Sequence, residues 1–402
     1  MSIKNKRGII MLLLVDSGSR IFRKYILQNA KENNIPICLV KENPVSWEKP
    51  YIMDYITNQE LQNMYNENKF DGIITYNELN LIETAKISEK INLPFHSSTL
   101  INRCRNKYEL RKFMYNKGLS DARSYLVENE KEFINIIDKI EFPLILKPVS
   151  GYGSISVFKA ESLQDVSYYF NTILNSFPEI SKVVVEPYFE GPEVSVEILV
   201  FQGEICFIEC TDKLLSAEPY FEERGHVFPG YKHNQFHNEI KTYIKQIVNS
   251  FEIENGAIHA EVRYAKQGPC LIELNLRIGG DFIPLLIQYA TGIDFSTGAF
   301  EIALGNQPTS LHKYKNKGAC IMFIIPDKQG TISHIKGLEH LKRPEVKDFY
   351  IMNNLKGIKT DIPPARFLSR VGYFIVEDKT PQKAEKLANE IINKLEIIYE
   401  TN

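Results

Sequence analysis

The sequence predicts a mixed α/β and α+β fold, in which a parallel-sheet domain comes first and antiparallel hairpins come later. Over the first hundred residues, short apolar strands alternate with helices, which is typical of a parallel sheet covered on both faces. Beyond about residue 190, strands of alternating polarity flank short turns that contain glycine. A length of 402 residues fits two or three domains.

The first domain is expected over residues 1–96. Its predicted strands and helices alternate in the order 8–15, 20–33, 37–40, 72–76 and 79–91. We interpret the first apolar run as a buried strand rather than a signal peptide, because Asp16 follows it without a small-residue cleavage site. Parallel sheets bind ligands beyond the carboxyl ends of their strands, where Glu78 lies here. Gly18 is alone in its loop, so a GxGxxG dinucleotide motif is absent.

A second region is expected over residues 97–310. Ser97 or Ser98 is expected to cap a helix that runs to about residue 117. A compact flap subdomain follows at about 120–186. Its predicted strands cover 124–127, 144–148, 155–158 and 183–186, and its predicted helices cover 131–140 and 163–177.

The rest of the second region contains two predicted hairpins. One pairs 194–200 with 204–209, and the other pairs 257–264 with 270–275 across the turn 266–268. Helices are expected at 238–251, 282–289 and 295–304. The tail, 311–402, is predicted to be a small subdomain that ends in a long helix at 381–398.

Composition and charge exclude several classes of protein. The chain has 48 Lys and Arg against 50 Asp and Glu, a near balance that argues against a general nucleic-acid or membrane-surface binder. No apolar run approaches the length needed to span a bilayer. The six cysteines are scattered without a CxxC pair, so neither disulfides nor a zinc site is indicated and a cytoplasmic location is expected.

The hairpin at 257–275 carries the most informative polar pattern. With its centre at Gln267, Glu261 faces Glu273 and His259 faces Asn275, and all four side chains share one face of the sheet. Because two facing carboxylates repel each other, a cation is expected between them. Two carboxylates and an amide oxygen suit a magnesium ion shared with a nucleotide phosphate.

The residues after this hairpin strengthen the interpretation. Arg277 could clamp an anion, and Gly279-Gly280 would allow close approach of the backbone. The alternative is a solvated sheet face with alternating charges. We favour the metal site, because an ordinary surface strand does not require Asn275, Arg277 and two glycines to follow it.

Two further segments carry a weaker signal. Lys147 closes an apolar strand, and a loop with Gly151 and Gly153 follows, in which backbone amides could cradle phosphates. The alternative is an ordinary turn with a solvated lysine. Further along, a buried strand at 183–186 runs through Pro187 into a strand at 193–197, which in isolation is a hinge between two sheets.

Together, these motifs resemble the ATP-grasp superfamily over nearly the whole chain. The resemblance implies an ATP-grasp fold with an N-terminal pre-ATP-grasp domain, a flap and a C-terminal antiparallel domain. It implies ATP and Mg²⁺, with Mn²⁺ as an alternative. The resemblance implies that Lys107 and Lys147 bind the phosphates of ATP, under a flap that contains Gly151, Gly153 and Ser154. It implies that Glu186, Pro187, Tyr188 and Phe189 form the adenine hinge and that Glu193 holds the ribose. It also implies that Glu261, Glu273 and Asn275 bind the metal and that Arg277 lies at the acyl phosphate.

Within that superfamily the chain is most similar to the L-amino acid ligases, of the type that makes bacilysin. The resemblance implies that Glu223 and the catalytic His226 border the acceptor pocket, although His226 could instead be a turn residue. It places Glu78, Gly279 and Gly280 beside the substrate. Asp281 stands where that branch carries a bulky aromatic residue, which implies a cationic or larger substrate unless Asp281 caps the next helix.

The expected activity is therefore ATP-dependent ligation of two amino acids through an acyl phosphate, as in antibiotic biosynthesis. Three alternatives stay open: a ligase or carboxylase of the purine or biotin-carboxylase type, a kinase on the same fold, and a nucleotide-binding regulator. The expected partners are small-molecule substrates, with neither nucleic acid nor membrane. The resemblance also allows a homodimer.

Overall fold

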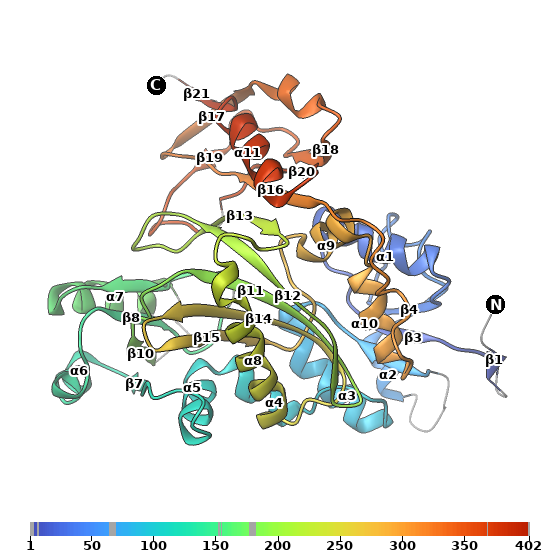
Figure 1. Cartoon of the computed structure of the whole chain (residues 1–402), viewed down its shortest axis with the longest axis horizontal. Coiled ribbons are helices and arrows are strands. Elements are labelled where there is room, and N and C mark those ends of the chain that lie inside the picture. Colours follow the sequence, from blue (N-terminus) through green and yellow to red (C-terminus); the bar gives the residue numbers. More distant parts are fainter. Residues whose placement is uncertain are drawn as a thin grey trace.

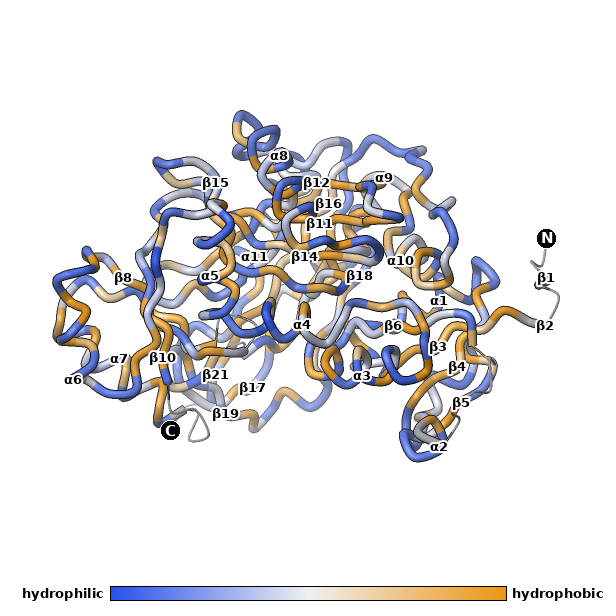
Figure 2. The backbone as a smooth tube through the Cα atoms, turned by 90° about the horizontal axis from the view of Figure 1, so that it is seen from below, coloured by the Kyte–Doolittle hydropathy of each residue, from blue (hydrophilic) through white to orange (hydrophobic). Residues whose placement is uncertain are grey.

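A computed structural model describes residues 4–5, 8–63, 70–151, 153, 155–176, 182–367 and 369–400. Figure 1 shows three parts around a central sheet: the N-terminal domain, a flap sheet on the opposite side, and the C-terminal part above. Hydrophobic residues follow the central strands, and hydrophilic residues gather in the peripheral loops (Figure 2). No helix in the described ranges combines the length and apolarity that crossing a membrane would need.

The N-terminal domain contains the predicted parallel sheet. Its strand order is β5-β4-β3-β6, and the pairs β3–β4, β4–β5 and β3–β6 are all parallel. The elements are β3 (Leu12–Val15), α1 (Arg20–Glu32), β4 (Ile37–Val40), β5 (Asp54–Ile56), α2 (Asn58–Asn63), β6 (Gly72–Ile74), η1 (Glu78–Asn80) and α3 (Leu81–Ile91). Strand β5 was not predicted, because only one of its three residues is buried and it carries no apolar run.

Two other predictions in this domain need correction. The predicted strand 8–15 is divided, because β2 (Gly8–Ile9) pairs with β1 (Lys4–Asn5) and only β3 joins the parallel sheet. The helix predicted at 79–91 begins as the 3₁₀ turn η1.

The single helix predicted from residue 97 to 117 is wrong. It is divided into α4 (Ser98–Arg105) and α5 (Lys107–Asn116). Asn106 is extended, and its side-chain oxygen accepts hydrogen bonds from the backbone N–H groups of Tyr108 and Glu109, both at 3.1 Å. Asn106 therefore acts as an N-cap. The break places Lys107 at the start of α5, where its backbone N–H donates to the Val149 carbonyl at 2.8 Å.

The flap sheet is antiparallel, in the order β7-β10-β8-β9. Its elements are β7 (Tyr125–Val127), α6 (Glu130–Ile134), η2 (Ile137–Lys139), β8 (Leu144–Pro148), β9 (Phe158–Ala160), α7 (Leu163–Ser176) and β10 (Val183–Pro187). The strand predicted at 155–158 begins only at Phe158, because Ser156 has a φ of 56°, which interrupts an extended strand. The helix predicted at 131–140 is divided into α6 and η2.

The central sheet has eight strands in the order β15-β14-β11-β12-β13-β16-β20-β18. They are β11 (Glu193–Phe201), β12 (Glu204–Leu215), β13 (Glu223–Phe228), β14 (Gly256–Ala265), β15 (Gly268–Asn275), β16 (Gly318–Ile324), β18 (Val346–Ile351) and β20 (Gly372–Asp378). The helices that pack on it include α8 (Asn234–Ser250), α9 (Ile283–Thr291), α10 (Phe295–Ala303) and α11 (Pro381–Ile392). Because β13 pairs with β16, the sheet continues past residue 310 into the C-terminal part.

The long terminal helix predicted at 381–398 is also wrong beyond residue 392. Residues 396–399 form β21 (Glu396–Tyr399), which pairs with β17 (Gly330–Lys336). A short strand, β19 (Lys359–Thr360), lies on the other side of β17. The 3₁₀ turn η3 (Leu338–Lys342) follows β17 in the chain. Residues 396–399 therefore pair with β17 in a small sheet instead of extending helix α11.

The register of the β14–β15 hairpin is confirmed, but for a different reason. Glu261 pairs with Glu273 and His259 with Asn275, as predicted. The turn, however, has two residues, since Ala265 pairs with Gly268, and a bulge between Glu261 and Val262 shifts the register by one residue. Without the bulge, Glu261 would oppose Ile272 and the side chain of Glu273 would point to the other face. The bulge thus brings the two carboxylates together.

Candidate active site

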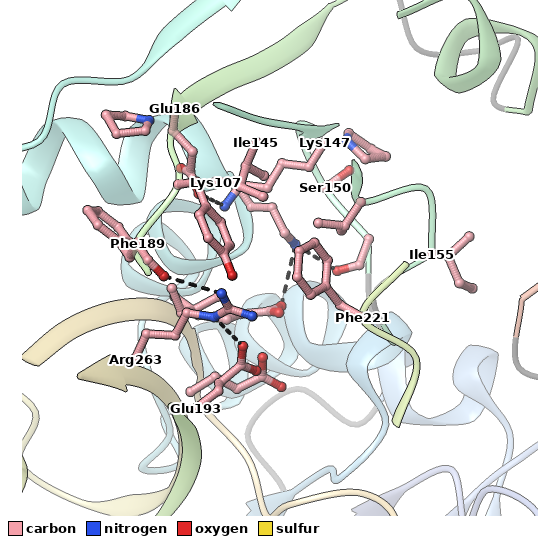
Figure 3. Close-up of a pocket in the computed structure, with 18 residues that line it drawn as sticks. Lys107, Ile145, Lys147, Ser150, Ile155, Glu186, Phe189, Glu193, Phe221 and Arg263 are labelled. Carbon is pink, nitrogen blue, oxygen red and sulfur yellow. Dashed lines mark hydrogen bonds and ion pairs between the residues drawn. The ribbon is translucent and has the colours of Figure 1, made fainter. Parts of the chain in front are cut away.

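Two cavities meet at the carboxylates of Glu261 and Glu273. The flap cavity lies between the flap sheet and the β14–β15 hairpin, and Lys107, Lys147 and Glu193 also line it (Figure 3). The domain cavity lies between the N-terminal domain and the central sheet. Because both carboxylates line both cavities, a ligand in one cavity can reach a ligand in the other at this point.

A buried ion cluster forms one wall of the flap cavity. Glu186 on β10 is 2% exposed, and its carboxylate accepts hydrogen bonds from Arg111 Nε at 2.8 Å and from Lys147 Nζ. Burial alone would raise the pKa of Glu186, but Arg111 and Lys147 outweigh it and lower that pKa to about 2. Burial also lowers the pKa of Lys147 to about 8, against the opposing effect of Glu186. The lysine thus already holds one anion.

The Glu186 cluster predicts that the free energy of unfolding falls at acid pH; this fall is called the acid limb. The pKa of Glu186 is about 2 in the folded chain, against an ordinary value of 4.5, so the unfolded chain binds more protons between these values. The stabilisation is fully present above about pH 4.5 and is lost as the pH falls towards 2, by up to about 3 kcal/mol. We expect urea unfolding of the wild type to show this loss.

The matched variants are Glu186→Gln and Glu209→Gln. Glu209 is the control, because its carboxylate is exposed and pairs with Lys241 at the surface. Glu186→Gln should be less stable at neutral pH, because Arg111 and Lys147 lose a buried partner, and should show a flatter acid limb. Glu209→Gln should keep the wild-type limb. An unchanged limb in Glu186→Gln would contradict the low pKa.

Lys107 links the flap loop to the carboxylate pair. Its Nζ donates to the Gly151 carbonyl at 3.0 Å and lies 3.4 Å from Glu273 Oε1. Gly151 and Gly153 have φ values of 149° and 67°, which favour glycine. Gly151 lines the flap cavity and Gly153 the domain cavity, so the loop passes over both; Ser154 lies outside the described residues.

The inner end of the flap cavity is apolar and aromatic. Strand β10 ends at Pro187, and Tyr188 and Phe189 follow in the connector. The Tyr188 ring stacks against Phe221 with centroids 6.1 Å apart. The Arg263 guanidinium lies 5.0 Å from the Tyr188 ring centroid and 4.9 Å from that of Phe221. A slot with apolar walls and a few polar groups at its edge suits a planar ring.

Lys213 on β12 occupies the centre of the site. Its Nζ lies 2.7 Å from Glu193, 3.0 Å from Glu223 and 3.1 Å from Glu261, and its side chain is 1% exposed. Burial opposes its charge, but the three carboxylates outweigh it and raise the pKa of Lys213 well above the usual value. Glu193 also accepts a hydrogen bond from Arg263 Nε at 2.7 Å. The glutamate predicted to hold a ribose is therefore already paired with two cations.

The residues present fit a divalent cation. Glu261, Glu273 and Asn275 all line the domain cavity and offer oxygen atoms, which Mg²⁺ prefers. The pKa of Glu261 is lowered, because Lys213 and His259 outweigh the effect of burial. His259 bridges Glu197, with Nδ1 2.5 Å from its carboxylate, and Glu261, with Nε2 at 3.6 Å, and so fixes the orientation of Glu261.

Arg277 projects into the domain cavity directly after the hairpin. Its Nε donates to Glu78 Oε2 at 2.8 Å, and Arg105 Nε binds the other oxygen of Glu78 at 2.9 Å. Gly279 is required for space, since a Cβ there would lie 2.7 Å from Glu197 Oε2. Gly280 faces open space in the cavity.

A second ion cluster borders the domain cavity. Arg370, just before β20, donates two hydrogen bonds to Asp281, at 2.7 and 2.8 Å, and its guanidinium lies 3.6 Å from the Phe323 ring centroid. His226 Nε2 lies 3.5 Å from Asp281. Burial would raise the pKa of Asp281, but Arg370 outweighs it and holds that pKa well below its usual range. Glu223 lies within ion-pair distance of both Arg370 and Lys213.

The structure decides two alternatives that the sequence left open. His226 is not a turn residue, because it lies in β13 with its side chain buried beside Asp281. Asp281 does not cap α9, because Phe282 holds the N-cap position without a side-chain hydrogen bond and both oxygens of Asp281 bind Arg370. Spacing alone would let Glu223, His226 and Asp281 hold a metal, but Lys213 and Arg370 already pair with the two carboxylates.

The hairpin carboxylates, Lys107, Lys147 and Arg277, which the sequence singled out, line the two adjoining cavities. Sequence reasoning missed the cations that hold these residues in place, which are Arg23, Arg111, Lys213, Arg263 and Arg370. A charged residue within an apolar strand was the available signal for Lys213 and Arg263. The other three lie on helices or in a loop, where a charge is unremarkable.

Two protein-family models match the chain. Residues 140–284 match the ATP-grasp domain, and residues 322–400 match the L-amino acid ligase C-terminal domain 2. The first range covers three strands of the flap sheet, β8, β9 and β10, and the hairpin, and the second contains Arg370. The two ranges therefore include the second ion cluster and, of the first, Lys147 and Glu186 but not Arg111.

This chain is also similar to several curated proteins and to a solved structure. Dapdiamide A synthase of Enterobacter agglomerans is 26% identical over 47% of this chain and 46% of its own length. The L-arginine-specific L-amino acid ligase of Bacillus subtilis is 22% identical over 59% of this chain and 58% of its own length. The chain thus spans about half the length of these two relatives. The crystal structure of an L-amino acid ligase from Bacillus licheniformis shares the fold, with a TM-score of 0.83, 24% identity, and coverage of 99% of this chain and 100% of that one.

Proposed function

We propose that this ATP-grasp ligase, which carries an ATP-grasp domain and an L-amino acid ligase C-terminal domain, joins the carboxylate of one amino acid to the amine of another to make a dipeptide. One observation carries the proposal: the flap cavity and the domain cavity share Glu261 and Glu273. A nucleotide in the first cavity and a small carboxylate in the second would meet at a metal-binding carboxylate pair. Arg277 lines the second cavity beside that pair.

ATP-grasp enzymes use ATP and a divalent metal, and the residues described fit both. Lys107, Lys147 and the flap loop, including Ser154, would hold the phosphates. The slot formed by residues 186–189 would hold the adenine, and Glu193 the ribose. Glu261, Glu273 and Asn275 would hold Mg²⁺, or Mn²⁺ in its place, which would neutralise charge on the phosphoryl group during transfer.

The reaction has two steps. A carboxylate oxygen of the first amino acid attacks the γ-phosphorus of ATP, the bond to the ADP oxygen breaks, and an acyl phosphate forms. The neutral amine of the second amino acid attacks the acyl carbon, the bond to phosphate breaks, and the departing phosphate takes up the proton that the nitrogen loses. Arg277 and His226 would stabilise the oxyanion formed on the way. Closure of the flap would keep water from the acyl phosphate.

The test is a matrix of the twenty amino acids in pairs, scored by ATP-dependent phosphate release with Mg²⁺. We expect release only when both a carboxylate and an amine substrate are present, loss of release with EDTA, and a dipeptide by mass spectrometry. A phosphorylated product without free phosphate would indicate a kinase instead. A requirement for bicarbonate or a nucleotide precursor would indicate a carboxylase or purine-type ligase.

A further inference from the structure

One arginine of the domain cavity has no anionic partner among the described residues. Three arginines line this cavity: Arg277 pairs with Glu78 and Arg370 pairs with Asp281. Within the part of the chain that the structure describes, Arg23 on α1 has no carboxylate at ion-pair distance. It thus differs from both other arginines of the cavity in carrying an uncompensated charge.

The position of Arg23 is nevertheless well defined. Its stem crosses Gly18, where an added Cβ would lie 3.1 Å from Arg23 Cγ. Its guanidinium lies 5.1 Å from the Tyr76 ring centroid, and Nη1 donates to the Gly279 carbonyl at 3.2 Å. The side chain therefore spans from the N-terminal domain to the glycine pair that follows Arg277.

The charge on Arg23 is disfavoured in the absence of a ligand. Burial is the largest effect and lowers the pKa of its guanidinium, and the positive charge of Arg277 lowers that pKa further. Tyr25 opposes burial, and Tyr76 and Asp281 oppose it by smaller amounts, but the pKa stays below its ordinary value. An anion placed beside Arg23 would reverse this effect. Its partners in the structure, a carbonyl oxygen and an aromatic ring, are neutral groups that an anion could join without displacing a salt bridge.

The proposed ligation supplies such an anion. Each of the two amino-acid substrates brings an α-carboxylate, and the carboxylate of the first is consumed in the acyl phosphate. The carboxylate of the amine-donating amino acid stays ionised from binding to product release, and it requires a cation in a partly buried cavity. Resting on the proposed function, we infer that Arg23 binds this spectator carboxylate and so selects a free amino acid as the amine substrate.

The experiment compares each active amine substrate with its α-carboxamide, which keeps the amine but removes the charge. We expect the wild type to prefer the free acid by about 10- to 100-fold in kcat/KM, as for a hydrogen bond to a charged group. Arg23→Gln should reduce this ratio to within a few-fold of one, and Arg23→Lys should retain part of it. Arg20→Gln is the matched control, because Arg20 is exposed at the start of the same helix and does not line the cavity.

A second arm distinguishes the source of the carboxylate. If Arg23→Gln instead abolishes a preference for aspartate over asparagine, or glutamate over glutamine, the bound group is a side-chain carboxylate, and the assignment to the amine substrate's α-carboxylate is overturned. If Arg23→Gln keeps the wild-type preference for acid over amide, the inference fails while the ligase activity stands.

Calorimetric titration makes the result independent of turnover. Amino acids and their amides are titrated into wild type, Arg23→Gln and Arg20→Gln in the presence of ADP and Mg²⁺. We expect amino acids to bind Arg23→Gln about 10-fold or more weakly than wild type, with amides affected much less. Equal affinities of the amino acids for wild type and Arg23→Gln would overturn the inference, even if the matrix of pairs showed no ligation and the proposed function failed.

Discussion

Replacement of Arg277 by alanine is expected to lower ligase turnover by about 100- to 1,000-fold, the range found when one preorganised donor to a developing oxyanion is removed. Arg277 follows Asn275 by two residues and lines the cavity that Glu261 and Glu273, the proposed metal ligands, also line. Glu78 holds its guanidinium in place. The measurement is kcat for ATP-dependent phosphate release with the best pair from the substrate matrix.

Arg105→Ala is the matched control for Arg277→Ala. Arg105 binds the other oxygen of Glu78 but does not line the cavity, so its loss should reduce turnover far less. Glu273→Ala should lose activity as Arg277→Ala does, because one of the two facing carboxylates is gone. Wild-type turnover in both Arg277→Ala and Glu273→Ala, in chains that unfold at the wild-type temperature, would refute the site assignment.

Lys213→Met is expected to lower the free energy of unfolding by about 3–5 kcal/mol, the usual cost of leaving buried charges without their partner. Lys213 contacts three carboxylates, and its side chain is 1% exposed, so methionine keeps the volume but removes the only cation close to all three among the residues described. Urea unfolding in EDTA measures the change. Wild-type stability in this variant would contradict the buried cluster.

Lys241→Met provides the comparison for this result. Lys241 pairs with Glu209 at the surface, with side chains 26% and 44% exposed, and such pairs contribute at most about 1 kcal/mol. Mg²⁺ should raise the stability of Lys213→Met more than that of the wild type, because a bound cation would replace part of the missing charge beside Glu261. An equal effect of Mg²⁺ on both would argue against a metal at this carboxylate.

The parts of the fold that depend on local pattern could be predicted from the sequence. Strand β4 and strand β8 were placed to the residue, because β4 is a continuous apolar run and β8 is an apolar run closed by Lys147 and Pro148. The prediction failed where a side chain interrupts a helical pattern, as Asn106 does between α4 and α5, or where distant strands compete for a segment, as β17 does for residues 396–399.

The site shows the same division. The carboxylates, lysines and Arg277 follow one another in a recognisable order, so they could be predicted. Arg370 and Asp281 are 89 residues apart in the sequence, and Arg111 and Glu186 are 75 apart. Only the folded chain shows that these charges pair, and therefore only the structure shows that Arg23 lacks such a partner among the described residues.

The bulge in the β14–β15 hairpin separates the chemistry of the site from the turn that closes it. Lys266 and Gln267 are exposed at the tip, beyond the bulge, so a label or short peptide inserted there would leave the pairing of Glu261 with Glu273 intact. Deleting a single residue between the tip and Ile272 would instead carry Glu273 to the opposite face of the sheet. The same hairpin thus offers one attachment point for a reporter group and, a few residues away, a segment whose length is fixed by the two carboxylates.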